Sequence, residues 1–424
     1  MLRISFLAAL LAALVFPAPA LADFALRDGD TVVFLGDSIT AARAYGKVIE
    51  KFTYLRYPDR KIHFVNAGWG GDTADGGLKR LERDVLSLKP TVVIVAYGVN
   101  DIGWGMRADE EHKQLYLAGV RGIVQQCLKA GARVFICSPA VTGEDPSRSE
   151  KGYLKKMADE GMELSRSLGG GAIDIHGTMR EVQRRVAKHN EGTSDPKKRV
   201  TLHAEDGIHL NDTGQICMAW AILKGLGADS AVSTATIDAA GPKVVEAGAC
   251  TVTELKGDAE GVEFTRLDKG LPLNLGLIGH LANAWFPLRE DLSRYMLCVR
   301  DLKDGRYDIV VDGKSIATHT AKELAEGVNI AGATRSGWEP GGTWDAQATE
   351  LENLVNARNE LEQAQKIGRH VDPDPPNKAQ RAAAIATANT QLEAIQREVA
   401  KPRPYKFVIR PAQEEKKEKE TKKQ

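Results

Sequence analysis

Three residues in two short segments have side chains that together could carry out nucleophilic chemistry. Ser38 stands in Phe34–Thr40 (FLGDSIT), just after a short apolar run that ends at a glycine. A serine at a turn from strand to helix exposes its hydroxyl above the sheet, where it can attack a carbonyl carbon. Asp206 and His209 lie three residues apart in Asp206–Leu210 (DGIHL). A histidine that takes a proton from serine needs an acid to fix its tautomer, and this spacing lets one loop deliver both.

The serine segment also has a purely structural interpretation. Thr40 stands where the Gly-x-Ser-x-Gly elbow of many hydrolases has its last glycine, so the segment is not that elbow. Serine is a common first residue of helices because its hydroxyl can cap them. Taken alone, the segment therefore indicates a capped turn as readily as a nucleophile.

Two further segments could supply hydrogen-bond donors for an oxyanion. Asn66–Thr73 (NAGWGGDT) follows a candidate strand, and its glycines allow close approach of a ligand to backbone amides. Asn100, in Tyr97–Asp101 (YGVND), could place its side-chain amide at the end of another strand. For each segment a plain turn is the alternative. The four segments together favour one site, because three follow candidate strands and the fourth precedes a helix.

The elements that must position these segments alternate between strand and helix from Asp23 to about Gly227. Near-continuous Val and Ile runs indicate strands buried on both faces, and hence a parallel sheet with helices on either side. Ligands of such sheets bind beyond the carboxyl ends of the strands. Apolar residues at helical spacing predict one helix over Thr73–Leu88, and another is expected over Thr213–Leu226. The candidate strands are Thr31–Leu35, Lys61–Val65, Thr91–Tyr97, Arg133–Cys137 and Ala172–Ile175.

The four segments resemble the conserved Ser, Gly, Asn and His blocks of the SGNH, or GDSL-like, hydrolases. The resemblance covers about Asp23 to Leu226, and all four blocks are intact. It implies an α/β fold, a flavodoxin-like three-layer sandwich with a five-stranded parallel sheet, and hydrolysis of esters or thioesters without a metal or cofactor. By this resemblance the catalytic triad is Ser38, Asp206 and His209, and the oxyanion hole is formed by Ser38, Gly71 and Asn100.

The second half of the chain has a different pattern of expected secondary structure. After about Ala228, strand-like pieces alternate with turns, which predicts a β-rich accessory domain of antiparallel hairpins. Helical stretches at about Trp344–Ile367 and Lys378–Ala400 predict a helical hairpin, because the prolines of His370–Asn377 exclude helix between them. A binding or spacer module, or a homodimer formed through these helices, is expected here. The predicted division is 1–22 signal peptide, 23–230 hydrolase domain, 231–412 accessory domain with the hairpin at about 344–400, and 413–424 disordered charged tail.

The start of the chain is typical of a secretory signal peptide. Arg3 precedes the apolar run Ile4–Phe16, and Ala20-Leu21-Ala22 resembles a cleavage site. The run is shorter than the roughly 20 residues that a membrane span requires. The mature protein is therefore expected to begin near Asp23, to be periplasmic or secreted, and not to stay inserted in a membrane.

Charge and cysteine content narrow the classes of partner and of site that this protein could have. The 57 basic and 57 acidic residues cancel, and loss of Arg3 leaves 56 against 57, so the charge gives no case for nucleic acid as a partner. The sequence contains no CxxC pair, so it suggests neither a zinc site nor a redox motif. Buried free thiols are the preferred interpretation, with a Cys250–Cys298 disulfide left open. The cysteines are Cys127, Cys137, Cys217, Cys250 and Cys298.

The substrate is the least constrained feature. Export and an appended β-rich domain are similar to arrangements in bacterial carbohydrate esterases, which favours removal of O-acetyl groups from a polysaccharide or a small ester. Trp69 and Trp104 flank the expected site and could stack on sugar rings, and Asp37 is a further candidate contact. A lipase, lysophospholipase or thioesterase acting on acyl lipids is the alternative. A non-catalytic binding protein on the same fold is the minor alternative.

Overall fold

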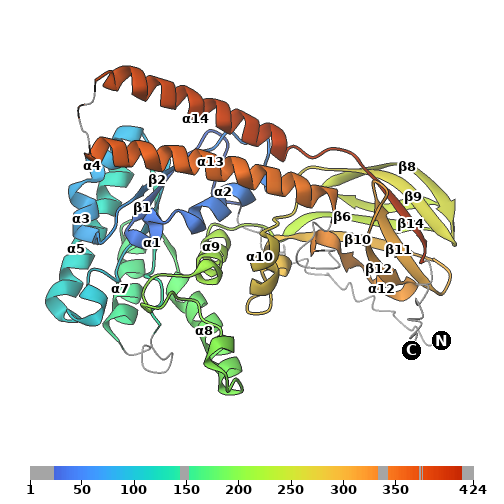
Figure 1. Cartoon of the computed structure of the whole chain (residues 1–424), viewed down its shortest axis with the longest axis horizontal. Helices are drawn as coiled ribbons and strands as arrows, with labels where there is room; N and C mark the ends of the chain where they lie inside the picture. The colour runs from blue at the N-terminus through green and yellow to red at the C-terminus, as the bar shows by residue number, and fades with distance from the viewer. Residues whose placement is uncertain (1–22, 144–151, 333–341, 372–373, 375, 413–424) are drawn as a thin grey trace, which may run out of the picture.

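The structure is a computed structural model that describes residues 23–143, 152–332, 342–371, 374 and 376–412 (Figure 1). The expected signal peptide, 1–22, and the expected charged tail, 413–424, lie outside the described residues. Among the described helices, none combines the length and apolar character needed to cross a bilayer.

A five-stranded, all-parallel sheet forms the centre of the first half. Its strand order is β2-β1-β3-β4-β5, so β1 and β3 are flanked by strands on both sides. Every residue of β3 is buried, as expected for a central strand covered on both faces. The predicted α/β fold with a five-stranded parallel sheet is therefore confirmed. The strands are β1 (Thr31–Gly36), β2 (His63–Gly68), β3 (Val92–Ala96), β4 (Arg133–Cys137) and β5 (Gly171–Ile173).

Helices cover both faces of this sheet, because alternate strand residues point to opposite sides. Val32 and Phe34 of β1 contribute to one core, and Val33 and Leu35 contribute to the other. The first face packs against α1 (Ser38–Ala41), α2 (Ala44–Arg56), α8 (Ile175–Glu191) and α9 (Asp212–Gly225). The second packs against α3 (Ala74–Lys79), α4 (Leu81–Asp84), α5 (Glu110–Lys129) and α7 (Tyr153–Ser167).

The prediction of a single helix over Thr73–Leu88 is wrong. The chain forms α3, α4 and a short 3₁₀ turn, η1 (Leu86–Leu88), with a break at Arg80, whose φ and ψ are −102° and 3°. Gly76 and Gly77 have low helix propensity. In addition, the Arg80 guanidinium is drawn inward to the Ala67 carbonyl and to a carboxylate, and these bonds favour the break over a continuous helix.

The second half forms two packed sheets, with strand orders β13-β10-β6-β7 and β12-β11-β14-β9-β8. A β-rich region is thus confirmed, but not every pair is an antiparallel hairpin, because β6 and β10 are parallel. Parallel pairing needs a long crossover, and the chain between these strands supplies it through β7, β8, β9 and two short helices. The elements are β6 (Ala231–Asp238), β7 (Lys243–Gly248), β8 (Cys250–Asp258), β9 (Gly261–Asp268), α10 (Gly276–Ala282), α11 (Leu288–Leu292), β10 (Arg294–Arg300), β11 (Arg306–Val311), β12 (Lys314–Thr320), α12 (Ala321–Glu326), β13 (Val328–Asn329) and β14 (Tyr405–Pro411).

Two long helices, α13 (Thr343–Val371) and α14 (Lys378–Ala400), run back from these sheets along the first half (Figure 1). Both pack against α2 as well as against each other. Leu351 and Val355 of α13 belong to the same buried core as Ile49 of α2, so the two halves share one core. Helix α13 extends to Val371, so the predicted end at Ile367 is wrong, as is the exclusion of helix at His370 and Val371. A proline biases mainly the residue directly before it, so the turn that precedes that residue can stay helical.

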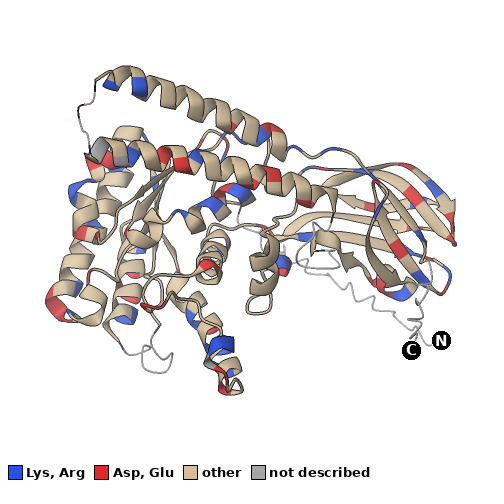
Figure 2. Ribbon diagram, viewed as in Figure 1, with Lys and Arg blue, Asp and Glu red and all other residues tan. Residues whose placement is uncertain are grey.

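The five cysteines are free and buried, as preferred from the sequence. The sulfurs of Cys250 and Cys298 each donate to a backbone carbonyl, those of Thr234 and Ala325, so the disulfide left open is not formed. Basic and acidic residues are interspersed along the ribbon (Figure 2).

Candidate active site

Ser38 lies at the sharp turn between β1 and α1. Strand β1 ends at Gly36, and Asp37 caps the helix by accepting a hydrogen bond from the Ile39 amide at 2.9 Å. This turn places Ser38 at the carboxyl end of the central strands. Its Oγ lies 2.8 Å from Nε2 of His209, although 171 positions separate the two residues in the chain.

Asp206 and His209 come from the loop directly before α9. Nδ1 of His209 lies 2.5 Å from Oδ2 of Asp206, and Oδ1 of Asp206 accepts the amides of Ile208 and His209, both at 2.9 Å. These hydrogen bonds, the one with the His209 ring first, lower the pKa of Asp206 to about 2. An ionised carboxylate therefore faces the ring nitrogen opposite the one near Ser38. This arrangement can orient an imidazole that accepts a proton from serine.

The glycine-rich segment forms a tight turn beside α1. The Trp69 amide donates to the Gly36 carbonyl at 2.9 Å, and the Asp72 amide donates to the Trp69 carbonyl at 3.3 Å. Gly71 has a φ of +71°, which glycine adopts without strain. A Cβ at Gly68 would lie 2.3 Å from the Ala41 amide nitrogen, so only glycine lets β2 approach α1 this closely. The segment Gly68–Thr73, called the oxyanion turn below, is thus held against the end of β1.

Asn100 adjoins this turn, and its amide group is held at both ends. Nδ2 donates to the Asp72 carbonyl at 3.0 Å, and Oδ1 accepts from the Trp104 indole at 2.7 Å. The Trp104 ring meets the His209 ring edge-on, with centroids 6.3 Å apart. The structure therefore brings Asn100, the oxyanion turn and His209 to one place, as the order of the segments predicts.

A polar cluster that the sequence interpretation missed lies beneath the turn. Arg80 donates to Oδ2 of Asp72 at 2.8 Å, to the Ala67 carbonyl at 2.7 Å and to the Tyr97 hydroxyl at 2.9 Å. The Tyr97 hydroxyl donates to the same Asp72 oxygen at 2.8 Å. The cluster joins the ends of β2 and β3 to the oxyanion turn. Arg80 gave no signal in the sequence, since an arginine within a helical pattern is normally exposed.

Two carboxyl groups near the site are buried. Burial raises the pKa of Asp37 to about 6 and that of Asp101 to about 7. Asp101 accepts the Ala74 amide at 2.9 Å and so fixes the start of α3. Asp37 is only 4% exposed, and its carboxylate caps α1. The expected substrate contact through Asp37 is therefore corrected to a structural role, because a buried cap does not face a ligand.

Several other side chains of the site are open to solvent. The side chains of His209 and Asp206 are 39% and 41% exposed, and Trp104 is 51% exposed. Trp69, in the oxyanion turn, is 38% exposed. Within the described residues, no group of three or more His, Cys, Asp or Glu side chains is arranged to hold a metal ion.

Two further histidines, one after β5 and one in the loop before Asp206, have packing roles. His176 and His203 are buried, and their rings approach the carbonyls of Pro139 and Val141 at 3.2 Å and 2.9 Å. Burial lowers the pKa of both rings. Neither competes with His209 as the partner of Ser38.

Comparison with known proteins finds relatives of both the sequence and the fold. Residues 34–215 match the model of the GDSL-like lipase/acylhydrolase family. The chain is similar to the acetylxylan esterase of Geobacillus stearothermophilus, with 25% identity over 223 residues that cover 47% of this chain and 94% of that protein. It is also similar to the uncharacterized lipoprotein YqeF of Bacillus subtilis (strain 168), with 25% identity over 171 residues, 38% of this chain and 68% of that protein.

Among solved structures, the chain resembles BT4096, a gut microbial diltiazem-metabolizing enzyme. The TM-score is 0.78 at 23% identity, and the match covers 91% of this chain and 98% of that one. At this identity the likeness shows the fold alone. Because it extends over 91% of the chain, the shared fold includes elements of the second half as well as the parallel sheet.

Proposed function

We propose that this chain, which carries a GDSL-like lipase/acylhydrolase domain and hydrolyses ester bonds, does so through an acyl-enzyme formed on Ser38. The observation that carries the proposal is the continuous line of contacts from Ser38 Oγ to His209 and on to Asp206. His209 Nε2 takes the Ser38 proton while Oγ attacks the ester carbonyl carbon. The Asp206 carboxylate stabilises the imidazolium that forms.

The negative charge that develops on the carbonyl oxygen is held by three donors. These are the amides of Ser38 and Gly71 and the side-chain amide of Asn100, which follow β1, β2 and β3 in the chain. The intermediate collapses as His209 returns its proton to the departing alcohol. Water then attacks the acyl-enzyme with His209 again as base, and the acid leaves Ser38 free.

The proposed substrate is a carbohydrate carrying O-acetyl esters. An acyl chain of a lipid gains about 0.8 kcal/mol for each CH₂ that it buries, and a lipid-specific site exploits this with an enclosed apolar surface. Here the His209 and Asp206 side chains are well exposed, and the exposed indole of Trp104 stands beside them. An open surface with aromatic side chains suits a bulky, polar alcohol and a small acyl group. The likeness to an acetylxylan esterase supports the same choice.

Export and the division of the chain are further parts of the proposal. The pattern of residues 1–22 supports a signal peptide, and one relative is named a lipoprotein. We therefore place the mature protein in the periplasm or outside the cell. The boundary at about residue 230 and the homodimer formed through the C-terminal helices stay predictions. Mass measurement of the mature protein and of its native assembly would test them.

The first experiment measures acid release by the wild-type chain from acetylated xylan, p-nitrophenyl acetate and p-nitrophenyl palmitate. Ser38→Ala should abolish activity, whereas Ser167→Ala, a matched change at an exposed position in α7, should leave it intact. Acetate release from xylan that depends on Ser38 supports the proposal. Preference for palmitate would replace it with the acyl-lipid alternative. Activity that persists in Ser38→Ala would refute the assignment of the nucleophile.

A further inference from the structure

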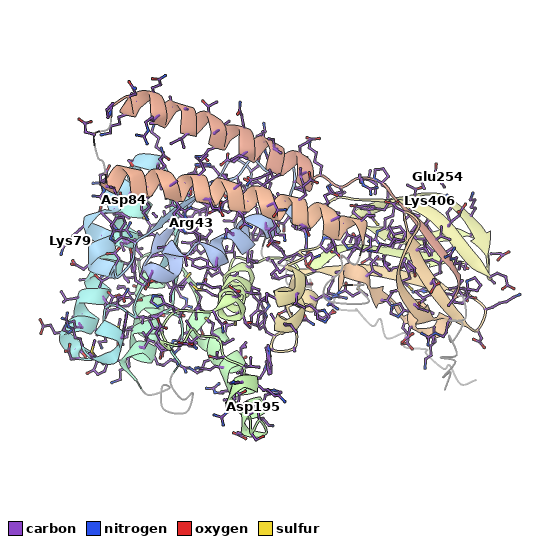
Figure 3. All side chains as sticks on the ribbon, in the orientation of Figure 1. Arg43, Lys79, Asp84, Asp195, Glu254 and Lys406 are labelled. Atoms are coloured by element: carbon purple, nitrogen blue, oxygen red, sulfur yellow. The ribbon has the colours of Figure 1, made fainter. Side chains whose placement is uncertain are left out.

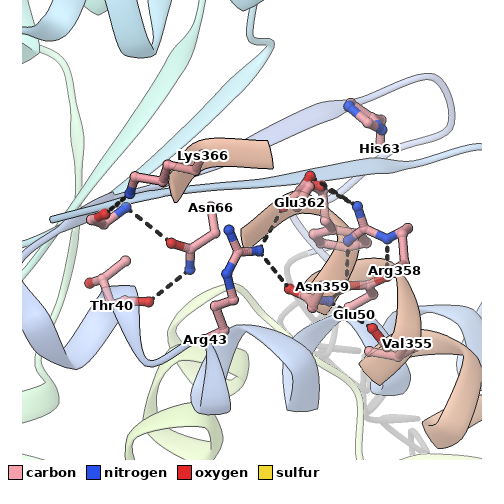
Figure 4. Close-up of polar contacts among 12 residues, drawn as sticks. Thr40, Arg43, Glu50, His63, Asn66, Val355, Arg358, Asn359, Glu362 and Lys366 are labelled. Atoms are coloured by element: carbon pink, nitrogen blue, oxygen red, sulfur yellow. Dashed lines mark hydrogen bonds and ion pairs between the residues drawn. The ribbon is translucent and has the colours of Figure 1, made fainter. Parts of the chain in front are cut away.

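Helix α13 of the second half contacts the oxyanion turn directly. The Lys366 ammonium donates a hydrogen bond to the carbonyl of Gly68, the first residue of that turn (Figure 4). It also lies 5.2 Å from the centroid of the Trp69 ring. A lysine ammonium over an indole face is attracted by the ring quadrupole. One side chain therefore contacts two successive residues of the turn, from a position 298 residues further along the chain.

A second contact joins α13 to the end of the nucleophile helix. Arg43 lies between α1 and α2 in the left-handed conformation, with a φ of 65°, and is buried beneath α13 (Figure 3). Its guanidinium donates to Glu362 at 2.7 Å and to Asn359 at 3.2 Å, both on α13 (Figure 4). An uncommon backbone conformation five residues after Ser38 is thus stabilised by side chains of the second half.

A third set of contacts fixes the register of α13. Arg358 is 1% exposed, pairs with Glu50 of α2 through bonds of 2.7 Å and 3.0 Å, and donates to the Phe64 carbonyl of β2 at 2.9 Å. From Arg358, two turns of helix lead to Lys366, because each turn contains 3.6 residues. The bond to Phe64 and the bond to Gly68 thus attach the same helix to β2 near its start and at its end.

We propose that Lys366 is a positioning residue for the acyl-transfer site, and that α13 holds the oxyanion turn in its working geometry. The inference rests on the proposed function, since the turn carries the Gly71 amide. Lys366 binds the Gly68 carbonyl and the Trp69 ring, so it acts through the turn and not on reacting atoms. Oxyanion donors are effective only within about 2.7–3.1 Å of the oxygen, and a displacement of about 1 Å can cost 10²-fold in rate.

The test compares three variants of the full chain with p-nitrophenyl acetate at 25 °C. Lys366→Met keeps the length of the side chain and removes the ammonium, whereas Lys366→Arg keeps the charge. Lys378→Met is the matched control, because Lys378 is an exposed lysine at the start of α14 that pairs only with Asp374 among the described residues. We expect Lys366→Met to lower kcat roughly 10-fold, less than the 10²–10³ for loss of a donor, with KM changed less than about twofold. Lys366→Arg should recover most of the rate, and the control should match wild type.

A second readout does not depend on activity. Hydrogen exchange of the backbone amides in Gly68–Thr73 should be faster in Lys366→Met than in wild type and unchanged in Lys378→Met. Unchanged exchange, unchanged kcat, or a higher KM at constant kcat would each overturn the proposal, the last by assigning Lys366 to substrate binding. If the wild-type chain hydrolyses no ester, the proposed function fails, and the exchange comparison still decides whether Lys366 holds the turn.

Discussion

The Arg358–Glu50 ion pair should be among the most sensitive points for the stability of this protein. The two side chains are 1% and 2% exposed, and Arg358 also donates to Phe64 and to Glu362, at 2.9 Å and 3.1 Å. In Arg358→Met, the Glu50 carboxylate stays buried and keeps one described partner, the Asn359 amide at 3.0 Å. Removing one member of a buried pair costs about 3–5 kcal/mol, mostly because the other charge is left uncompensated.

This cost converts into a shift of the melting temperature. Unfolding entropy near the transition is about 2.1 cal/mol/K per residue, or roughly 0.8 kcal/mol/K for a chain of about 400 residues. A loss of about 3–5 kcal/mol then lowers Tm by roughly 4–6 °C. The estimate treats the two halves as one cooperative unit, which the shared core of α2 and α13 supports.

Calorimetry and denaturant unfolding of wild type, Arg358→Met, Glu50→Met and the double variant would measure the coupling. The double variant should be less destabilised than Arg358→Met, because it leaves neither member of the pair as an uncompensated buried charge. Lys401→Met, which breaks an exposed pair with Glu398, should leave Tm unchanged. A loss below about 1 kcal/mol in Arg358→Met, or a double variant as unstable as the sum of the singles, would refute the reasoning.

Three further predictions concern the site. Burial raises the pKa of Asp37 from 3.8 to about 6, so the wild-type protein loses stability as pH rises through that window. Asp37→Asn should therefore be more stable than wild type by up to about 3 kcal/mol at pH 8 and equal to it near pH 3, as measured by urea unfolding. Asn100→Ala should lower kcat about 10²–10³-fold with the fold intact, and near-normal kcat in ester assays would remove Asn100 from the oxyanion hole. Trp104→Phe removes the indole donor to Asn100 and should lower kcat by about 10-fold or less in ester assays. A larger effect on KM for acetylated xylan than for p-nitrophenyl acetate would instead indicate that Trp104 contacts the sugar.

Much of the site could be predicted from the sequence because its information is local. Asp206 and His209 lie three residues apart on one loop, and Ser38 and Asn100 directly follow the apolar runs that form β1 and β3. Parallel strands end at the same edge of a sheet, so short segments after successive strands must come together. The structure brings these residues together as expected, and their catalytic roles stay a prediction until the variants are measured.

Only the tertiary structure decided which distant side chains meet. The inward turn of Arg80 and the bond of Lys366 to the oxyanion turn depend on the exact approach of separate elements, and periodicity does not encode that approach. Arg358 and Glu50 lie 308 positions apart, and their pairing exists because α13 packs on α2 in one register. Sequence patterns indicate which face of a helix or strand is apolar. Buried polar contacts depend in addition on which faces pack together and in which register.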